Sequence, residues 1–295
     1  MINKLVIIGV GLIGGSFALA LRRANKVKHI VGVGRSRENM QRALKRGVID
    51  EIAADLPSAL KHADVVLLAT PVGQIGGIMT QISPYLEPGT IVTDAGSTKQ
   101  DVVAAAHSYL ARHLRNFVPG HPVAGAELSG VSAADADLYD GKNLVLTPLE
   151  ETSAVAVKRV TELWQACGAR VSQMSAAEHD KILAAVSHLP HVLAFLLMNH
   201  ASSSAKHPDD PLGSDDPLRF AGGGFRDFTR IAGSSPEMWR DICLANREAL
   251  SRQIDAYQNE LTDLREMLAR GDGEALESVF ARAREARRRW LKNKS

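Results

Sequence analysis

The chain contains little cysteine, no excess of either charge and no long hydrophobic run. Its two cysteines, Cys167 and Cys243, are too few and too scattered for a disulfide framework or a thiolate zinc site, which fits a reducing cytoplasm. Lysine and arginine total 35 against 33 acidic residues, so bulk charge does not indicate binding to nucleic acid or to a membrane surface. The chain has no run of about 18 apolar residues, the length needed to span a membrane. An apolar strand is expected to begin within four residues of Met1, which leaves no room for a signal peptide. We expect a cytoplasmic protein that acts on a small molecule.

A glycine-rich turn follows the first apolar segment. Leu5–Ile8 predicts a buried strand, and it runs directly into Gly9, Gly11 and Gly14 with the spacing Gly-x-Gly-x-x-Gly. The first glycine permits a tight turn, the second lets main-chain N–H groups approach a pyrophosphate, and the third lets the next helix pack closely on the strand. The alternative is that the glycines only shape a strand-to-helix turn. We expect a dinucleotide site.

The residues after the second predicted strand indicate which dinucleotide is bound. An NAD enzyme usually carries Asp or Glu there to bind the ribose hydroxyls, whereas this chain has Gly34, Arg35, Ser36 and Arg37. A guanidinium can pair with a 2′-phosphate in bidentate fashion, so the segment favours NADP. If both arginines are only solvated loop charges, the cofactor is NAD. The other expected cofactor contacts are Leu12, Ile13, Thr70 and Pro71.

Short aliphatic runs alternate with helical patterns in the first part of the chain. These runs are Leu5–Ile8, His29–Val33, Val65–Ala69, Thr90–Thr93, Phe117–Val118, Leu144–Leu146 and Arg170–Val171. Such alternation predicts βαβ crossovers and a mainly parallel sheet with helices on both faces. We therefore expect an α/β domain of the Rossmann type, binding a dinucleotide, over residues 1–173.

Strand patterns disappear over residues 174–295, which predicts an all-helical second domain. Ser175 and Glu178 form a capping box, and Pro236 directly after Ser235 predicts the start of a long helix. The apolar residues of this helix are Trp239, Ile242, Leu250, Ile254, Tyr257, Leu261, Leu264 and Leu268. One small domain does not need so long an apolar stripe, so we expect a homodimer through the helical domain. A loop of His, Pro, Asp and Gly, from about 203 to 224, interrupts the helices.

Two polar segments follow predicted strands and therefore lie at the carboxyl edge of the sheet. Ser97 lies in Asp-Ala-Gly-Ser-Thr-Lys, where it is either a site residue or only the N-cap of the next helix. His121 is the second residue of the segment Gly-His-Pro-Val-Ala-Gly-Ala-Glu-Leu-Ser-Gly, which begins at Gly120. A histidine titrates near neutral pH and can take a proton from a substrate hydroxyl, so His121 is the leading general base. A purely structural histidine is the alternative.

The segment Ser187-His188-Leu189-Pro190-His191 lies inside the first predicted helix of the second domain. Pro190 removes a main-chain hydrogen bond, so the helix should kink or open there. Ser187, His188 and His191 gather on one side of this kink and are candidate substrate contacts. A metal site is not expected, because no third ligand with suitable spacing accompanies the two histidines.

A glycine-rich segment, Gly-Gly-Gly-Phe-Arg-Asp-Phe-Thr-Arg-Ile-Ala, spans residues 222–232. Three consecutive glycines let main-chain amides approach a ligand. Arg230 near its end can clamp a carboxylate through two parallel N–H bonds.

These segments together resemble the prephenate/arogenate dehydrogenase family, also called the TyrA family, of tyrosine biosynthesis. The resemblance extends over nearly the whole chain, and the motifs GHPVAGAELSG, SHLPH and GGGFRDFTRIA with SSPEMWRD carry it. It implies that a hydride leaves the hydroxyl-bearing ring carbon of a cyclohexadienyl substrate for the nicotinamide, and that the ring carboxylate leaves as carbon dioxide. It also implies a dehydrogenase without a regulatory or chorismate mutase module.

The resemblance implies roles for individual residues. His121 would accept the proton of the ring hydroxyl, and Ser97 would hydrogen-bond near that hydroxyl and the nicotinamide. His191 would contact the substrate side chain, and Arg230 would anchor its carboxylate. Trp239 would lie near the site, although a core position is an equal alternative.

The substrate's side chain is the least determined part of this prediction. Arogenate carries an ammonium where prephenate carries a keto group, so a nearby carboxylate would favour arogenate. Asp137 is the candidate for this carboxylate, so we expect arogenate slightly more than prephenate. The alternative is that Asp137 is only a solvated turn residue. A prephenate-specific or dual-substrate enzyme using NAD, a β-hydroxyacid or imine reductase and a non-catalytic NADP sensor remain as other functions.

Overall fold

The computed structural model of the protein describes residues 1–125, 128–204 and 217–292. The chain divides into two compact units, Met1–Arg247 and Glu248–Ser295. The first unit contains strands and helices, and the second is helical. Two residues of the segment that begins at Gly120, and most of the loop expected between 203 and 224, lie outside the described residues.

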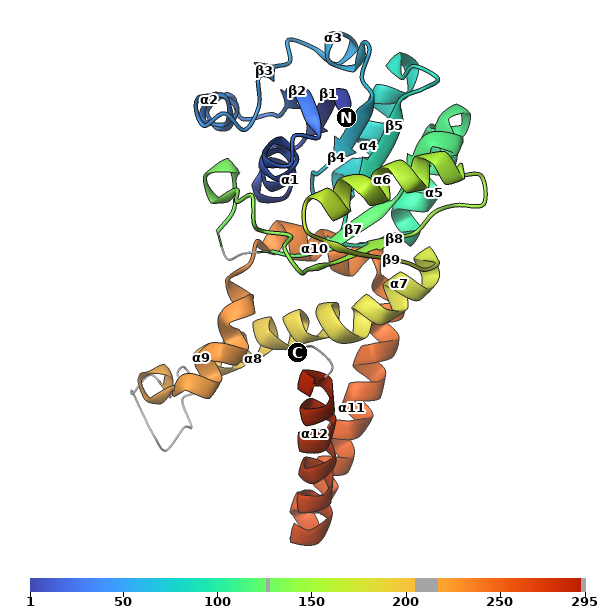
Figure 1. Cartoon of the computed structure of the whole chain (residues 1–295). Coiled ribbons are helices and arrows are strands. Elements are labelled where there is room, and N and C mark those ends of the chain that lie inside the picture. Colours follow the sequence, from blue (N-terminus) through green and yellow to red (C-terminus); the bar gives the residue numbers. More distant parts are fainter. Residues whose placement is uncertain (126–127, 205–216, 293–295) are drawn as a thin grey trace. The chain divides into compact units, whose positions relative to one another are not determined.

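The main sheet of the first unit has six strands (Figure 1). They are β1 (Ile2–Ile8), β2 (Val27–Val33), β3 (Glu51–Ile52), β4 (Val65–Leu68), β5 (Ile91–Asp94) and β6 (Phe117–Val118). Every adjacent pair is parallel, in the order β3-β2-β1-β4-β5-β6. The order reverses between β1 and β4, and ligands of such sheets lie beyond the carboxyl ends of the strands at this point. The expected Rossmann-type sheet is confirmed.

Helices cover both faces of this sheet. They are α1 (Leu12–Arg23), α2 (Arg37–Lys45), α3 (Leu56–Leu60), α4 (Val72–Ile82), α5 (Gln100–Tyr109) and α6 (Ala154–Ala166), with short turns η1 (Ser83–Tyr85), η2 (Ala111–Asn116) and η3 (Val131–Ala133). Leu5 and Ile7 pack on one face with Phe17 of α1 and Trp164 of α6, whereas Val6 packs on the other face with side chains of α4 and α5. Burial of both faces explains why the strands are continuous apolar runs rather than alternating ones.

A second, three-stranded sheet lies after the main one in the chain. It consists of β7 (Gly120–Val123), β8 (Asn143–Leu146) and β9 (Arg170–Gln173), with β7 and β8 antiparallel and β8 and β9 parallel. The sequence predicts β8 and β9 but does not predict β7, whose Gly120 and Pro122 are poor strand formers. Pairing with β8 sets β7 in register, so that His121 lies opposite Val145.

The rest of the first unit is helical. Its elements are α7 (Ala176–Leu183), the π-helical turn η4 (Ala184–His188), α8 (Leu189–Ser204), η5 (Pro217–Phe220), α9 (Gly223–Thr229), η6 (Arg230–Gly233) and α10 (Pro236–Ala245). The two predicted helix starts are confirmed, because Ser175 Oγ accepts from the Glu178 N–H at 3.1 Å and Ser235 Oγ accepts from the Met238 N–H at 3.3 Å.

Two interruptions of these helices affect the site. The predicted opening next to Pro190 is observed as the π-helical turn, which ends at His188. The single long helix expected from Pro236 is wrong, because it breaks at Asn246, which has φ −107° and ψ 29°. Asn246 turns its amide inward and donates to the main-chain oxygen of Asp180 at 2.8 Å. This bond is made by the residue at which α10 ends.

The second unit is a hairpin of two helices. It takes most of α11 (Arg247–Arg270) together with α12 (Gly273–Lys292). Gly271 joins them with φ 64°, in the left-handed region that glycine adopts without strain, and Asp272 Oδ1 caps α12 by accepting from the Ala275 N–H at 3.0 Å. Leu268 and Phe280 are 62% and 59% exposed, so the hairpin keeps apolar side chains uncovered.

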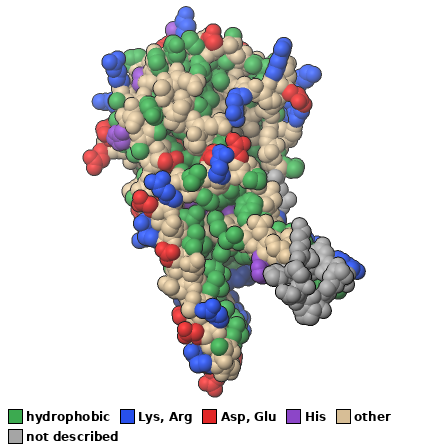
Figure 2. Space-filling model, turned by 180° about the vertical axis from the view of Figure 1, so that it is seen from behind, with side chains coloured by type: hydrophobic (Ala, Val, Ile, Leu, Met, Phe, Trp, Pro, Cys, Tyr) green, Lys and Arg blue, Asp and Glu red, His purple; other side chains and the backbone are tan. Residues whose placement is uncertain are grey.

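Apolar side chains are also exposed along α7 and α8, and Figure 2 shows hydrophobic side chains uncovered on the helical part of the chain. Val186 and Leu196 are 68% and 57% exposed. Within Ala176–Ser203 an 18-residue window has a mean hydropathy of 1.6, so by length and composition alone this helix could cross a membrane. It contains the buried polar residues His179, Asp180 and His188, which bind other parts of the same unit.

Replacing Gly14 with alanine is expected to destabilise the protein. The added methyl group would lie 2.8 Å from Ile7 Cγ2 and would collide with the main-chain oxygen of Gly9. Overpacking of this kind costs about 1–3 kcal/mol, so the midpoint of thermal unfolding should fall. Gly11→Ala is the matched control, because its methyl group would meet no atom within 4 Å. Equal unfolding midpoints for the two variants would contradict the packing role of Gly14.

Candidate active site

The glycine fingerprint forms a tight turn at the carboxyl end of β1. Gly9 has φ 101°, and a Cβ there would lie 2.5 Å from the Ala69 oxygen and 2.9 Å from the Thr70 nitrogen. The turn therefore packs directly on the segment that follows β4. Gly11, in contrast, faces open space. Gly9 thus allows close packing on the segment after β4, and Gly11 leaves the main chain open to a ligand.

The residues around this turn fit a dinucleotide. Gly11 is the N-cap of α1 without any side-chain cap, and the first turn of α1 carries no acidic residue. Its main-chain N–H groups, those of Leu12 and Ile13 among them, are therefore suited to phosphate oxygens. Thr70 Oγ1 is buried without a hydrogen-bond partner, and Pro71 follows it as the N-cap of α4. An orphaned hydroxyl next to Gly9 is a position that a bound cofactor would satisfy.

The segment after β2 has an additional constraint that the sequence did not indicate. A Cβ at Gly34 would lie 2.5 Å from Met40 Sδ, so packing against α2 favours glycine there. Ser36 caps α2 by accepting from the Asn39 N–H at 3.2 Å, which leaves its hydroxyl hydrogen able to donate. Arg35 and Arg37 are both exposed.

His121 lies in β7 and is buried against a second histidine. It is 8% exposed, and its Nδ1 lies 2.8 Å from His179 Nε2, with the two rings edge to face. His179 Nδ1 in turn lies 2.7 Å from Asp180 Oδ1, and both of these residues are buried. The three side chains form a continuous chain of hydrogen bonds.

Asp180 also holds the start of α5. Its Oδ1 accepts from the Lys99 N–H at 2.8 Å, and its Oδ2 accepts from the Gln100 N–H at 2.9 Å. Burial opposes ionisation of this carboxyl, but the hydrogen bonds from His179 and the two amides outweigh it and hold the pKa of Asp180 below its ordinary value. Asp180 is therefore a carboxylate at neutral pH.

The surroundings keep His121 neutral. Burial is the largest cause, and the positive charges that His179, Lys99 and His188 carry when protonated add to it, so the pKa of His121 lies well below its ordinary value. A neutral imidazole has one nitrogen with a free lone pair, and this nitrogen can accept a proton. The predicted general base is thus buried in its basic form.

A buried ion pair fixes the edge of the sheet next to His121. The Lys99 ammonium contacts Asp94 Oδ2, and both side chains are 0% exposed. Asp94 ends β5, and it also accepts from the Gly96 N–H at 2.7 Å and from the Gly120 N–H at 3.1 Å. One carboxylate therefore joins the end of β5, the turn after it and the start of β7.

Ser97 lies in the turn that Asp94 holds. The alternative that Ser97 is the N-cap of the next helix is wrong, because Lys99 occupies the cap position of α5 and the side chain of Asp180 supplies the cap. Ser97 is half-buried, three residues after the end of β5 at the carboxyl edge of the sheet.

The two histidines of the SHLPH segment have different environments. His188 is 1% exposed, and its Nδ1 lies 3.1 Å from Asn246 Nδ2. Burial lowers the pKa of His188 to about 4, so this ring is neutral. His188 therefore belongs to the interior network around Asp180, and the structure does not give it an exposed position for a substrate.

His191 is held by two contacts. Its Nδ1 donates to the main-chain oxygen of Ser187 at 2.8 Å, and its ring stacks on Trp239 with centroids 3.9 Å apart. Burial lowers the pKa of His191, the bond to Ser187 opposes this, and the charge of Arg230 adds to the lowering. His191, Trp239 and Arg230 are therefore gathered in one place. Ser187 contributes its carbonyl to this group.

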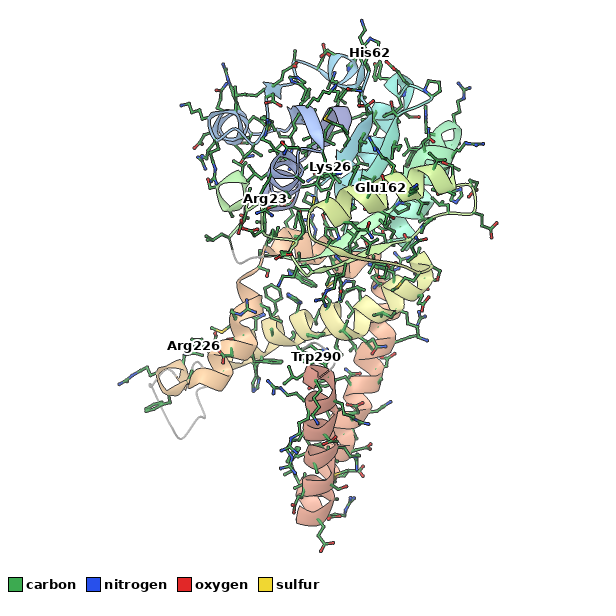
Figure 3. All side chains as sticks on the ribbon, in the orientation of Figure 1. Arg23, Lys26, His62, Glu162, Arg226 and Trp290 are labelled. Carbon is green, nitrogen blue, oxygen red and sulfur yellow. The ribbon has the colours of Figure 1, made fainter. Side chains whose placement is uncertain are left out.

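The glycine-rich segment begins α9. Gly222 is the N-cap of α9, and added Cβ atoms at Gly222, Gly223 and Gly224 would meet nothing within 4 Å. The main chain there is open to a ligand. Arg226 lies on α9 (Figure 3), and Arg230 follows it in the chain by about one helical turn.

The structure does not bring Asp137 to the site. Its carboxylate pairs with the Arg23 guanidinium, and Arg23 also donates to the Ala136 oxygen at 3.0 Å. Arg23 is the last residue of α1 (Figure 3), so the pair lies at the end of that helix away from the glycine turn. The expectation that Asp137 meets a substrate ammonium is wrong, because a nearer cation already binds it.

Sequence reasoning missed the residues that hold the predicted base. His179 and Asp180 directly follow the capping box that begins α7, but they are 58 and 59 positions from His121. A His-Asp pair one turn into a helix that starts beside the sheet was the available signal. Asn246 gave no signal, because it lies within a helical pattern.

The sheet and the glycine fingerprint define a dinucleotide-binding fold, and the buried histidine in β7 fits a nicotinamide-dependent oxidoreductase. Two family models match the chain: prephenate dehydrogenase, nucleotide-binding domain, over residues 17–173, and prephenate dehydrogenase, dimerization domain, over residues 175–282. The chain therefore belongs to the prephenate dehydrogenase (TyrA) family of tyrosine biosynthesis, as the resemblance implied. The alternative of a β-hydroxyacid or imine reductase is set aside.

Relatives of known name share most of the chain. The prephenate dehydrogenase of Bacillus subtilis is 39% identical over 290 residues, which cover 97% of this chain and 76% of the relative. The cyclohexadienyl dehydrogenase of Zymomonas mobilis is 35% identical, with 97% and 95% covered. The crystal structure of Aquifex aeolicus prephenate dehydrogenase in complex with hydroxyphenyl propionate and NAD+ superposes with a TM-score of 0.88 at 35% identity, covering 99% of this chain and 98% of that one.

Replacing Lys99 with methionine is expected to destabilise the protein strongly. The substitution would leave the Asp94 carboxylate buried without its cation, which typically costs about 3–5 kcal/mol. Urea unfolding would measure the loss. Lys158→Met is the matched control, because Lys158 is 79% exposed and pairs only within α6, with Glu162 (Figure 3). Similar unfolding free energies for the two variants would contradict a structural role for the buried pair.

Proposed function

We propose that the protein oxidises and decarboxylates a cyclohexadienyl substrate, with His121 as the general base. The observation that carries this proposal is the buried, neutral His121 beside the carboxyl edge of the sheet. Nicotinamide-binding folds present the reactive ring at this edge. The glycine turn at the end of β1 would hold the cofactor phosphates, and Thr70 and Pro71 would line the same side.

The residues of the site then have separate tasks. His121 would take the proton of the ring hydroxyl, and Ser97 would hold that hydroxyl in line with it. The bound nicotinamide supplies the oxidation, because it accepts a hydride from the hydroxyl-bearing carbon. The electrons of the bond to the ring carboxylate stay in the ring as carbon dioxide leaves, and the ring becomes aromatic. His191 and Trp239 would orient the side chain, and Arg230 would bind its carboxylate.

Prephenate is the proposed substrate. The preference for arogenate rested on Asp137, and Asp137 is paired with Arg23 at the far end of α1. The charges near His191 that the structure supports are positive, from Arg230, and this suits the carboxylate of a keto-acid side chain. Curated relatives bear the names prephenate dehydrogenase and cyclohexadienyl dehydrogenase, so both substrates belong in the test.

NADP is the proposed cofactor. The segment after β2 carries two exposed guanidiniums, on Arg35 and Arg37, and the Ser36 hydroxyl can donate between them. The position directly after the strand is Gly34, which packs against Met40 and carries no carboxylate to repel a 2′-phosphate. NAD is the alternative, and it is the cofactor named with the Aquifex aeolicus enzyme.

The proposed division of labour follows the chain. Residues 1–173 would bind the dinucleotide, and residues 174–295 would bind the substrate and form a cytoplasmic homodimer. Each unit exposes apolar side chains, Val186 and Leu196 in the first and Phe280 in the second, and these support burial against a partner. The match to a dimerization domain over residues 175–282 supports the same division.

A four-way assay tests substrate and cofactor together. Purified protein would be supplied with prephenate or arogenate and with NAD or NADP, and we expect the highest kcat/KM with prephenate and NADP. Arg35→Ala with Arg37→Ala should raise the KM for NADP about 10-fold or more and leave NAD nearly unaffected, because a charge-assisted pair is lost. Lys45→Ala, on the same helix as Arg37, is the matched control. A wild-type preference for NAD would refute the cofactor proposal, and turnover of neither substrate would refute the function.

Two variants separate chemistry from binding. His121→Asn should lower kcat by about 100-fold to 10,000-fold with little change in cofactor affinity, because it removes only the base. Arg230→Ala should instead raise the KM for the substrate, by about 10-fold or more, because it removes the carboxylate anchor. Steady-state kinetics with cofactor-binding titrations would measure both. A kcat of His121→Asn equal to that of the wild type would remove His121 from the mechanism.

A further inference from the structure

The hydrogen bonds behind His121 determine which of its nitrogens is basic. Asp180 is ionised and can only accept, so His179 Nδ1 must carry a hydrogen and donate it across 2.7 Å. In neutral His179, Nε2 therefore has a free lone pair. His121 Nδ1, 2.8 Å away, must donate to this lone pair. What remains on His121 is a lone pair at Nε2, the nitrogen directed away from His179.

We propose that His179 and Asp180 are positioning residues for the oxidation. They fix Nε2 of His121 as the basic nitrogen, and His179 receives the proton that His121 gives up at Nδ1. The inference rests on the proposed function, in which His121 is the base. It adds a second histidine and a carboxylate to the reacting unit. Neither residue touches the substrate.

The proton transfers balance without any further reactant. The O–H bond of the substrate breaks and its proton binds His121 Nε2, while the C–H bond of the hydroxyl-bearing carbon breaks and its hydrogen leaves as a hydride with the electron pair. The Nδ1 proton of His121 then crosses to His179 Nε2. His121 is neutral again, and the positive charge rests on His179, whose Nδ1–H faces the Asp180 carboxylate. The proton returns along the same path to the oxygen of the aromatic product.

The environment of His121 explains why the charge moves. A proton that stayed on His121 would place a cation in a buried position near the Lys99 ammonium, which disfavours it. On His179 the same charge lies beside a carboxylate, and a buried charge with a paired partner is far less costly. The pair of histidines therefore accepts one proton more readily than His121 alone would.

The charged and titratable groups that face this pair come from four elements. They are Asp94 and Lys99 from the end of β5 and the turn after it, Asp101 from α5, Asp180 from α7 and His188 from the π-helical turn. Asp94 and Lys99 are paired with each other, and His188 is neutral above about pH 4, with a pKa of about 4. The two histidines share a hydrogen bond, so a proton bound by one ring acts directly on the other.

A structural role alone would not require His179. Asp180 holds the start of α5 through two main-chain amides, and this contact needs only the carboxylate. The decisive variant is therefore His179→Gln, which keeps an acceptor for the His121 Nδ1–H but has no place for a proton. His107→Gln, an exposed histidine on α5, is the matched control. Asp180→Asn is a second variant. Its side-chain amide could donate to His179 Nδ1, and this would reverse the direction of the hydrogen bonds between the side chain at position 180, His179 and His121.

The first measurement is the dependence of kcat on pH for wild type and variants. We expect His179→Gln to lower the plateau of kcat about 10-fold to 100-fold and to move the acid limb down by about one pH unit or more, because the lone His121 binds its proton more weakly. Asp180→Asn should show a lower kcat at neutral pH, and His107→Gln should match the wild type. A lowered plateau with an unmoved acid limb, or no loss of kcat at all, would overturn the proposal.

The second measurement does not depend on turnover. Imidazole nitrogen NMR of the cofactor-free protein should show hydrogen on Nδ1 of both His121 and His179 at pH 8, and uptake of a single proton by the pair on acidification. In His179→Gln, His121 should bind its proton at a lower pH than the wild-type pair does. Hydrogen on His121 Nε2 at pH 8 would overturn the proposal, whichever substrate the enzyme uses. Wild-type protein that oxidises neither substrate would refute the proposed function, and the NMR result would still decide the hydrogen order.

Discussion

The carboxylate of Asp180 is the interaction on which the site depends. Its two oxygens accept from the start of α5 and from His179, and its main-chain oxygen accepts from Asn246. Asp180 thus connects the start of α5, His179 and the break between α10 and α11. A charge can remain in such a dry position because three donors meet the carboxylate, the Lys99 and Gln100 N–H groups and His179 Nδ1. The same requirement fixes the distance between the helical segment and β7, and so the place of His121.

The local parts of the fold could be predicted from the sequence. The strand and glycine turn at Gly9 lie within a dozen residues, and their chemistry is set by neighbours in the chain. The caps at Ser175 and Ser235 are equally local and were found. β3 has two residues, too few for any pattern, and β7 becomes a strand only because β8 lies beside it.

The site was predictable only in part for the same reason. His121 follows a strand, so its place at the sheet edge could be inferred, but its partner His179 is 58 residues away. Asp137 shows the opposite error. Its nearness in sequence to the His121 segment indicated a role, while Arg23, 114 residues earlier, determined its contact. Pairing of charges across the chain is decided by folding, and a charged residue alone does not reveal its partner.

The π-helical turn at Ala184–His188 has a consequence for how this chain can change. Such a turn holds one residue more than regular α-helix winding needs. Loss of one residue from it would let the turn close to regular winding, and the residues that follow would keep their face of the helix. His191 would then stay on the face of Trp239. Insertions and deletions are usually tolerated in loops, but in this protein a helix interior can also change in length by one residue while two groups stay aligned.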